Sequence, residues 1–295
     1  MAKSKGRWGG TWTEEKLQSF EKYVKAYLDI MNNYRDRYRW KLIYFDAFAG
    51  SGTKENEKVD NRQRLAGFDI EPEELSVYKG AAERVLAIKK RGFDFYWFVD
   101  SNRTANDKLR LKLENGIANP KLVFRPDDAN EQIKILGNLL QKDKSYKSLV
   151  LLDPFGMQVK WEALTHLQGT GTDLWILLPS GVAINRLLQR DGSLKYPQRL
   201  TEYFGLPEAN VLSYFYKEKT SETLFGQETI QSKLGQPIKR IADFYVERLK
   251  GLFKHVSKPM VLLNNNKSPI YHFVFASNNA TALKIADYII GKGKK

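Results

Sequence analysis

Five short, unbroken apolar runs, separated by helical stretches, constrain the fold of this chain more than any other feature of its sequence. The runs lack the polar alternation of a half-exposed strand, so we expect strands that are buried on both faces. Strands that alternate with helices are usually joined in parallel. The sequence therefore predicts an α/β fold with a doubly wound, mostly parallel sheet. Its first five strands are expected at 42–45, 95–99, 122–124, 149–152 and 174–178.

The two ends of the chain carry different patterns. Apolar residues at three- and four-residue spacing predict an amphipathic helix over 13–38. Two apolar runs, 259–263 and 270–275, flank an Asn- and Pro-containing turn and predict an antiparallel hairpin. With the hairpin the sheet has seven strands, and a last helix is expected over 280–290. Helices between the strands are expected near 80–91, 103–115, 130–141, 161–167 and 182–190.

Two segments are longer than ordinary connections and are interpreted as insertions in a single core. Residues 53–79 are charged and contain Gly and Pro, and they could close over a ligand as a lid. We divide the chain into a basic tail with its helix (1–40), a core that contains the inserted loop 53–79 (41–192), a helical insertion (193–257), and a hairpin and helix that complete the core (258–295).

The charge balance indicates an anionic partner. The chain has 295 residues, with 48 Lys and Arg against 34 Asp and Glu, which gives a formal net charge of +14. Nucleic acid is the usual partner of such a charge, although a merely solvated basic surface is the alternative. Residues 34–41 interleave cations with rings, so Arg35, Arg37 and Arg39 are candidate phosphate contacts. The other interpretation of this segment is a helix end with one wet face.

The chain contains no cysteine, which removes several chemistries. There can be no thiolate metal site and no cysteine nucleophile, so the covalent mechanism of cytosine-C5 methylation is excluded. The three histidines are scattered, and we predict no metal site. No apolar run approaches the roughly 18 residues that a bilayer span requires, and the N-terminus lacks the apolar core of a secretory signal. We therefore expect a cytoplasmic protein with no membrane partner.

Carboxylates follow the first four predicted strands. Asp46 precedes a small-residue turn that contains Gly50 and Gly52, and Asp100, Asp128 and Asp153 follow the next three strands. Each of them alone is better explained as a helix cap or turn residue. Because the carboxyl ends of parallel strands meet at one edge of a sheet, four together favour a ligand site there.

These residues resemble class I S-adenosylmethionine (SAM)-dependent methyltransferases, especially those that methylate amino groups of nucleobases. Asp46 to Gly52 is similar to their motif I, and 153–156 (D-P-F-G) stands at their catalytic D-P-P-Y. More narrowly, these motifs and the helical insert resemble the three-Cys-motif partner family. That family is associated with a protein bearing three cysteines spaced as in radical-SAM enzymes. The resemblance covers about 40–192 and 258–278, and it implies a Rossmann-like fold.

The resemblance also implies residue roles. Asp46 would hold the ammonium of SAM, Asp100 its ribose hydroxyls, and Asp128, or less well Asp127, its adenine amino group. Asp153 and the Pro154 carbonyl would accept hydrogen bonds from the amine to be methylated, and Phe155 would stack on the target base. Gly156 would lie at the acceptor. Pro179 and Ser180 follow the fifth strand at the same edge, where they would line the acceptor pocket or simply form a strand-to-helix turn. The implied cofactor contacts are Asp46, Phe48, Ala49, Gly50, Ser51, Gly52, Asp100, Ser101, Asp127, Asp128, Ala129 and Asp153.

Three functions remain open at this point. The resemblance implies a SAM-dependent methyltransferase that acts on nucleic acid, on an exocyclic amino group of a base. In this chain Phe155 replaces the motif's second proline and Gly156 replaces its aromatic residue. That departure motivates a non-catalytic accessory protein that binds SAM and nucleic acid and serves a three-cysteine partner in DNA repair or modification. A metal-dependent nuclease using Asp127, Asp128 and Asp153 is the third hypothesis.

Overall fold

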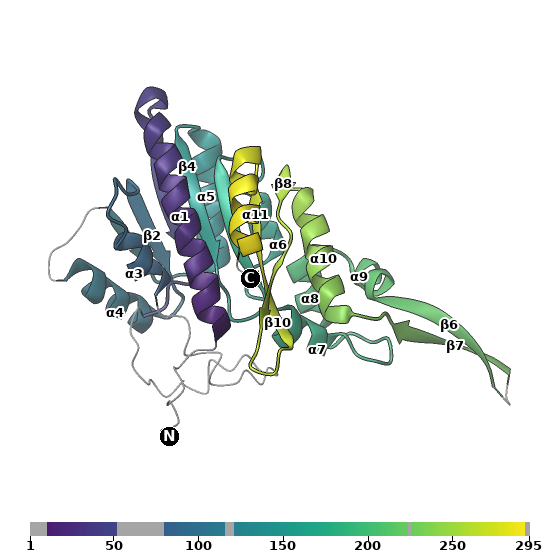
Figure 1. Cartoon of the computed structure of the whole chain (residues 1–295). Coiled ribbons are helices and arrows are strands. Elements are labelled where there is room, and N and C mark those ends of the chain that lie inside the picture. Colours follow the sequence, from purple (N-terminus) through teal and green to yellow (C-terminus); the bar gives the residue numbers. More distant parts are fainter. Residues whose placement is uncertain (1–10, 52–79, 116–120, 224–225, 293–295) are drawn as a thin grey trace, which may run out of the picture.

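The computed structural model describes residues 11–51, 80–115, 121–223 and 226–292. Its centre is one sheet in the order β3-β2-β1-β4-β5-β10-β8, with β9 paired to β10 (Figure 1). Neighbours among the first five strands are parallel, whereas β10 is antiparallel to β5, β8 and β9. The mostly parallel α/β sheet and the antiparallel hairpin are thus confirmed. The five parallel strands are β1 (Lys41–Asp46), β2 (Phe95–Val99), β3 (Leu122–Arg125), β4 (Tyr146–Leu152) and β5 (Thr172–Leu178).

The hairpin strands are β9 (Met260–Leu263) and β10 (Pro269–Ser277). Seven strands follow one another in the sheet order and β9 pairs with β10 beside it; of these, the two-residue β8 (His255–Val256), which joins β10, was not predicted. So short a strand leaves no periodic pattern in the sequence. β5 and the inner part of β10 are buried along almost their whole length, which explains why their sequences are apolar without alternation.

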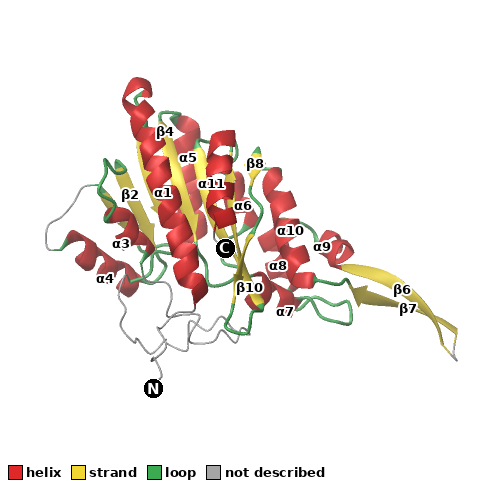
Figure 2. Ribbon diagram, in the orientation of Figure 1, coloured by secondary structure: helices red, strands yellow, loops and turns green. Residues whose placement is uncertain are grey.

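Helices cover both faces of the sheet (Figure 2). α1 (Thr11–Tyr38) and α11 (Ala280–Lys292) contact each other and lie across one face, with α3 (Ala81–Leu86) beside α1. α5 (Ala129–Lys142) and α6 (Trp161–Thr165) lie behind the sheet in that view. α4 (Arg103–Glu114) precedes β3. Together these helices bury the core residues of the five parallel strands, such as Tyr44, Phe98 and Trp175.

The segment 193–257 is not wholly helical, and this part of the prediction was wrong. It contains α8 (Pro197–Phe204), α9 (Glu208–Phe215) and α10 (Pro237–Lys250). Between α9 and α10 lies a two-stranded ribbon, β6 (Tyr216–Thr223) and β7 (Gly226–Lys233), which pairs only with itself and extends away from the body (Figure 1). The ribbon sequence is rich in Lys, Glu, Thr and Gln, so it lacks the apolar alternation that predicts strands.

The direction of α1 determines which of its residues approach the ligand edge of the sheet. Its last residue, Tyr38, is followed within three residues by the start of β1 at Lys41. The end of α1 therefore lies at the amino edge of the sheet, and its beginning lies at the carboxyl edge. Within the described part of the chain, no helix has the length and apolar character needed to cross a membrane.

Candidate functional site

The sheet has one point where its order reverses. β1 lies between β2 and β4, and the chain continues to β2 and β3 on one side and to β4 and β5 on the other. In open α/β sheets a crevice forms at the carboxyl ends of the strands at such a switch point, and ligands bind there. The residues that follow β1, β2 and β4 are therefore the first candidates for a site.

The turn after β1 is joined to the strands on both sides of it. The backbone N–H of Ala47 donates to the Leu151 carbonyl of β4 over 3.1 Å, and that of Ala49 donates to the Val99 carbonyl of β2 over 2.9 Å. Gly50 has φ +63°, a conformation that favours glycine. The expected cofactor residues Phe48, Ala49, Gly50 and Ser51 thus lie across the switch point. Gly52 and the proposed lid, 53–79, lie outside the described residues.

Asp100 is brought to this turn by the end of β2. One carboxylate oxygen accepts a 3.0 Å hydrogen bond from the backbone N–H of Gly50, and the other accepts a 2.8 Å bond from that of Asn102. Burial raises the pKa of Asp100 above its usual value. Ser101 beside it is exposed. The structure therefore brings together Gly50 and Asp100, two residues that the sequence placed at the same edge of the sheet.

Asp46 is the most perturbed carboxyl group at this edge. It is buried, and its oxygens accept hydrogen bonds of 3.2 Å from the Phe48 backbone N–H and from the Tyr44 hydroxyl. Burial is the largest cause that raises its pKa to about 7, and the negative charges of Asp153 and Asp100 raise it further. The ends of β1, β2 and β4 thus place three carboxyl groups close enough to repel one another.

Asp153 is held by a residue that we did not predict. The ammonium of Lys16, from the first turns of α1, lies 2.5 Å from Oδ2 of Asp153, and both side chains are almost fully buried. Oδ1 of Asp153 is also buried and has no partner among the described residues. The two residues are 137 positions apart. The only local sign was that Lys16 falls on the buried face of α1, four residues from both Trp12 and Phe20.

Asp128 has a structural role that a lone strand-end aspartate often has. Its Oδ1 caps α5 by accepting from the backbone N–H groups of Asn130 and Glu131 at 2.8 and 3.2 Å. Asp127 accepts from the side chain of Gln132 at 2.7 Å. Both carboxylates remain exposed at the rim, and Ala129 is buried behind them. Asp127 and Asp128 lie at the same edge as Asp46 and Asp100, but their charges are not among the causes that raise the pKa of Asp46.

The loop after β4 is fixed from behind by Asn130. Its side chain donates to the Gln158 carbonyl at 2.9 Å and accepts from the Lys160 backbone N–H at 2.7 Å. Within the loop, Pro154 and Gly156 are buried and Phe155 is half-buried. Asn130 is a second residue near the candidate site that sequence analysis missed, because a position in the first turn of α5 gave no reason to expect its side chain to reach 28 residues along the chain.

Ser180 does not present its hydroxyl to an acceptor pocket. It is fully buried in a π-helical turn (Ser180–Ile184), and its Oγ lies 2.6 Å from Nδ1 of His272 in β10. Burial lowers the pKa of His272 to about 4, so the imidazole is neutral at pH 7. Pro179 is buried as well. The pair joins the turn to β10.

The three arginines expected to contact nucleic acid lie at the amino edge of the sheet, opposite the carboxylates. Arg35 is 2% exposed, and its guanidinium forms an ion pair with Asp94 and donates to the Gly92 carbonyl at 2.8 Å. The prediction that Arg35 binds phosphate is corrected, because these protein groups occupy its donors. Arg37 and Arg39 are exposed, but they lie far from the candidate site.

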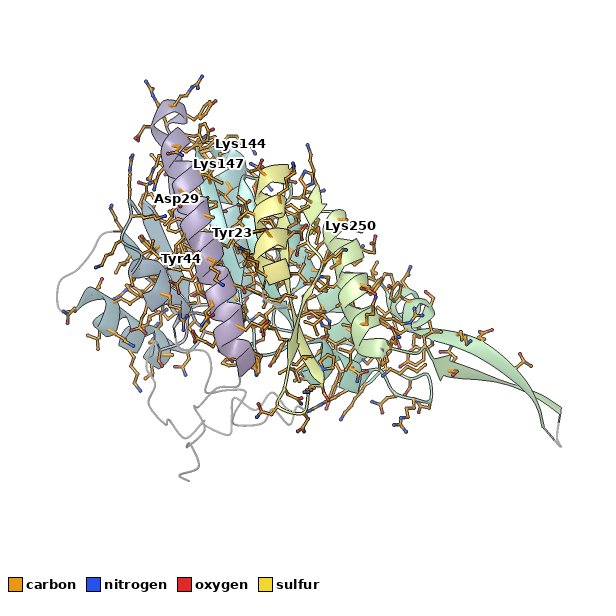
Figure 3. The ribbon with its side chains drawn as sticks, in the orientation of Figure 1. Tyr23, Asp29, Tyr44, Lys144, Lys147 and Lys250 are labelled. Atoms are coloured by element: carbon orange, nitrogen blue, oxygen red, sulfur yellow. The ribbon has the colours of Figure 1, made fainter. Side chains whose placement is uncertain are left out.

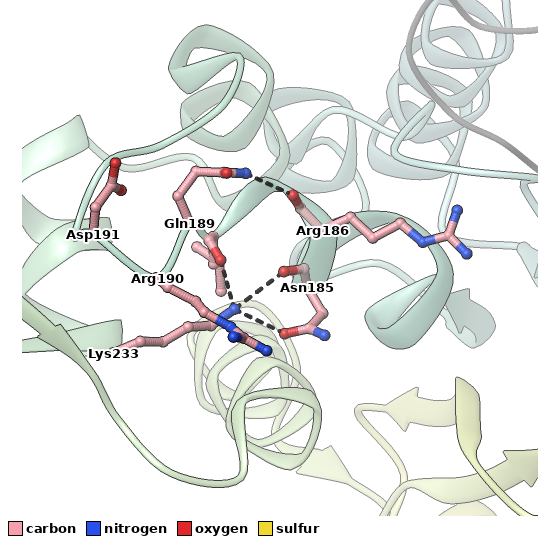
Figure 4. Close-up of a pocket in the computed structure, with 7 residues that line it drawn as sticks. Asn185, Arg186, Gln189, Arg190, Asp191 and Lys233 are labelled. Carbon is pink, nitrogen blue, oxygen red and sulfur yellow. Dashed lines mark hydrogen bonds between the residues drawn. The ribbon is translucent and has the colours of Figure 1, made fainter.

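A separate pocket lies beside α7 (Asn185–Leu187), away from the carboxylates (Figure 4). Its central cation, Lys233, donates to the Asn185 and Leu188 carbonyls and to the Asn185 side chain at 3.1, 2.6 and 3.0 Å. We interpret this lysine as the connection between the ribbon and α7. Across the described residues, no three His, Asp or Glu side chains are grouped as a metal site requires. The nuclease hypothesis gains no support.

Comparisons with known proteins give no family for the chain. No model of a known protein family matches it, and no curated protein sequence matches it.

Proposed function

We propose that this chain binds SAM at the carboxyl edge of the sheet and transfers its methyl group to a nucleic acid, as class I methyltransferases do. The single observation that carries the proposal is the convergence of Asp46, Asp100 and Asp153 beside the Gly50 turn at the switch point. A sheet order that places an antiparallel strand next to β5 agrees with the resemblance to that class. The acceptor proposed is an exocyclic amino group of a base.

The charges at this edge fit a cationic cofactor. SAM carries a sulfonium and an ammonium. Burial, and to a smaller extent repulsion by Asp153 and Asp100, raises the pKa of Asp46, and an adjacent cation would stabilise its ionised form. Asp46 would hold the ammonium, and Asp100 has lone pairs left for ribose hydroxyls beyond its two backbone hydrogen bonds. The exposed Asp128 has Oδ2 free of partners among the described residues, where it could accept from an adenine amino group.

When bound, SAM supplies an electrophilic methyl group. The residues of the chain would position the amine that attacks it and remove water from around it. Lys16 orients Asp153 through Oδ2, and Oδ1 is then the acceptor for the N–H of the amine. An exocyclic amine is a poor nucleophile because its lone pair is delocalised into the ring, and hydrogen bonds that favour a pyramidal nitrogen make the lone pair available. Phe155, half-buried next to Asp153, would stack on the base.

A non-catalytic accessory protein is the second candidate, and a specific observation favours it. The Lys16 ammonium already forms a hydrogen bond with Asp153, where the resemblance would place the target amine. Together with the D-P-F-G sequence, this contact suggests a site that keeps the cofactor and has lost its acceptor. Such a protein would bind nucleic acid for a partner enzyme. The candidate for that enzyme is the three-cysteine protein associated with the family that this chain resembles.

Methyl transfer from radiolabelled SAM to single-stranded DNA, duplex DNA and RNA separates the two candidates. The methyltransferase proposal predicts label in one acceptor, and loss of that label in Asp153→Asn while SAM affinity stays within a few-fold. Asp107→Asn, an exposed position on α4, is the matched control and should keep full activity. SAM binding without transfer to any acceptor would favour the accessory protein. Full activity of Asp153→Asn would overturn the catalytic assignment.

A further inference from the structure

The amino edge of the sheet carries a surface that the proposed function does not use. It forms where α1 ends, β1 begins and β4 begins, and Lys41 pairs with Tyr146 across β1 and β4. The left-handed conformation of Arg39, φ +54°, turns the chain from the helix into the strand. We name this surface the amino-edge patch. Its residues are Tyr34, Arg37, Tyr38, Arg39, Trp40, Lys41, Lys144, Tyr146 and Lys147.

Three rings of the amino-edge patch lie in a row. Tyr38 lies on Trp40 with ring centroids 4.9 Å apart and planes at 21°, and Tyr34 follows with its centroid 6.4 Å from that of Tyr38. Tyr34 and Tyr38 are 47% and 50% exposed, so both rings are accessible to a ligand. Burial in the protein therefore does not explain why these rings stand in a row.

Cations lie over the same rings. Arg37 is 5.4 Å from the Tyr38 centroid, Lys147 is 5.3 Å from that of Trp40, and Lys41 is 5.3 Å from that of Tyr146. Lys144 and Lys147 lie beside the end of α1 (Figure 3). They are close enough that the charge of Lys144 adds to burial in lowering the pKa of Lys147.

Five cations of the patch form no ion pair with the described residues. Other cations near it have carboxylate partners: Arg35 pairs with Asp94, Lys90 with Asp29, and Arg91 with Asp36. In contrast, no ion pair within the described ranges involves Arg37, Arg39, Lys41, Lys144 or Lys147. The nearby Asp143 accepts from the backbone N–H of Ser145, and the charge of Lys41 contributes to lowering its pKa.

We propose that the amino-edge patch is a binding site for single-stranded nucleic acid, separate from the carboxyl edge. Unpaired bases would stack on Tyr34 and Tyr38, and the five unpaired cations would neutralise phosphates. Duplex nucleic acid keeps its bases inside a stack and would use only the cations, so the exposed rings favour a single strand. The six residues of β1 separate the two edges by about 20 Å, so the patch anchors a strand away from the candidate cofactor site.

Fluorescence anisotropy with a labelled 20-nucleotide DNA, the same sequence as RNA, and the duplex tests the inference without SAM. Tyr34→Ala/Tyr38→Ala should bind single strands at least tenfold more weakly, whereas Tyr34→Phe/Tyr38→Phe should bind within twofold of wild type. The phenylalanine pair keeps the rings and removes only the hydroxyl groups. Equal affinity of the alanine and phenylalanine variants would overturn the stacking role.

Two matched triple variants test how much the cations of the patch contribute to single-strand binding. Arg37→Gln/Lys144→Gln/Lys147→Gln should weaken single-strand binding by tenfold or more and should flatten its salt dependence. Lys254→Gln/Lys267→Gln/Lys284→Gln removes three exposed cations elsewhere and should have less than a threefold effect. If both triple variants lose the same affinity, or if polyglutamate competes as well as single-stranded DNA, the inference is wrong. Calorimetry with SAM should be unchanged in the patch variants, so failure here and failure of the proposed function are distinguishable.

Discussion

Asp46 is a carboxyl group whose ionised form is disfavoured by its position in the fold. It is buried between the ends of β2 and β4, with Asp100 and Asp153 as its charged neighbours. Since its pKa is about 7 in the folded chain, the protonated form is favoured by folding. This contribution to stability is fully present below the unfolded pKa near 3.8 and is lost as pH rises through 7, for a total of about 4 kcal/mol. A bound cation would reverse this preference.

We predict that SAM affinity rises about tenfold from pH 6 to pH 8, because Asp46 must ionise to hold a cation. Calorimetry in buffers of different ionisation enthalpy would show proton release that is larger at pH 6 than at pH 8. Asp46→Asn keeps the size of the side chain and removes its titration, so it isolates this contribution from the amino group of SAM. Identical pH profiles for wild type and Asp46→Asn would contradict the assignment.

The buried pair of Lys16 and Asp153 gives a second prediction. Lys16→Met leaves the Asp153 carboxylate buried without its cation, so the free energy of unfolding should fall by about 3–5 kcal/mol. Lys16→Met/Asp153→Leu removes both charges and should recover much of that loss. Urea denaturation at pH 7 measures both, with Lys25→Met, in an exposed pair with Glu21, as a control that costs less than about 1 kcal/mol. Additive losses in the double variant would show that the pair is not coupled.

At the scale of elements, the strands with unbroken apolar sequences were predictable and the polar ones were not. The runs in β1, β2, β4 and β5 follow directly from burial on both faces. The ribbon β6–β7 was missed because its strands pair only with each other and its sequence is polar, although Tyr216 and Lys233 at its base contact the loop after α7 and α7 itself. Arg35 was misinterpreted because its sequence neighbours are exposed cations, whereas Arg35 itself lies on the buried side of α1 and pairs with Asp94.

The π-helical turn after β5 depends on close contact with β10. A Cβ on Gly181 would lie 2.3 Å from the Pro269 carbonyl oxygen and 3.0 Å from Ile270 Cα, and these backbone atoms cannot move aside easily. We therefore predict that Gly181→Ala lowers the free energy of unfolding by about 1–3 kcal/mol. Gly291→Ala in α11, where a Cβ would meet nothing within 4 Å, should be neutral or stabilising. Thermal unfolding followed by circular dichroism compares them, and equal melting temperatures would contradict the packing argument.

At the scale of the whole molecule, the two edges of one sheet carry different groups: three carboxyl groups converge at one edge, and exposed rings and cations gather at the other. Strand direction made the convergence of carboxyl groups at one edge predictable, because every parallel strand ends there. The contact of Lys16 with Asp153 and the position of the arginines could not be predicted without the path of α1, which crosses the sheet from the carboxyl edge to the amino edge. Helical periodicity indicates which face of a helix is buried, but it does not indicate which end of the sheet a residue reaches.

Titration calorimetry of the full chain with SAM tests the central claim, that the switch point at the carboxyl edge binds this cofactor. We predict binding of one SAM per chain by the wild-type protein. Asp100→Asn should weaken it at least tenfold, because its carboxylate lies against Gly50, whereas the exposed Asp107→Asn should bind as the wild type does. No binding of SAM by the wild-type chain at millimolar concentration, or equal affinity in Asp100→Asn and Asp107→Asn, would contradict it.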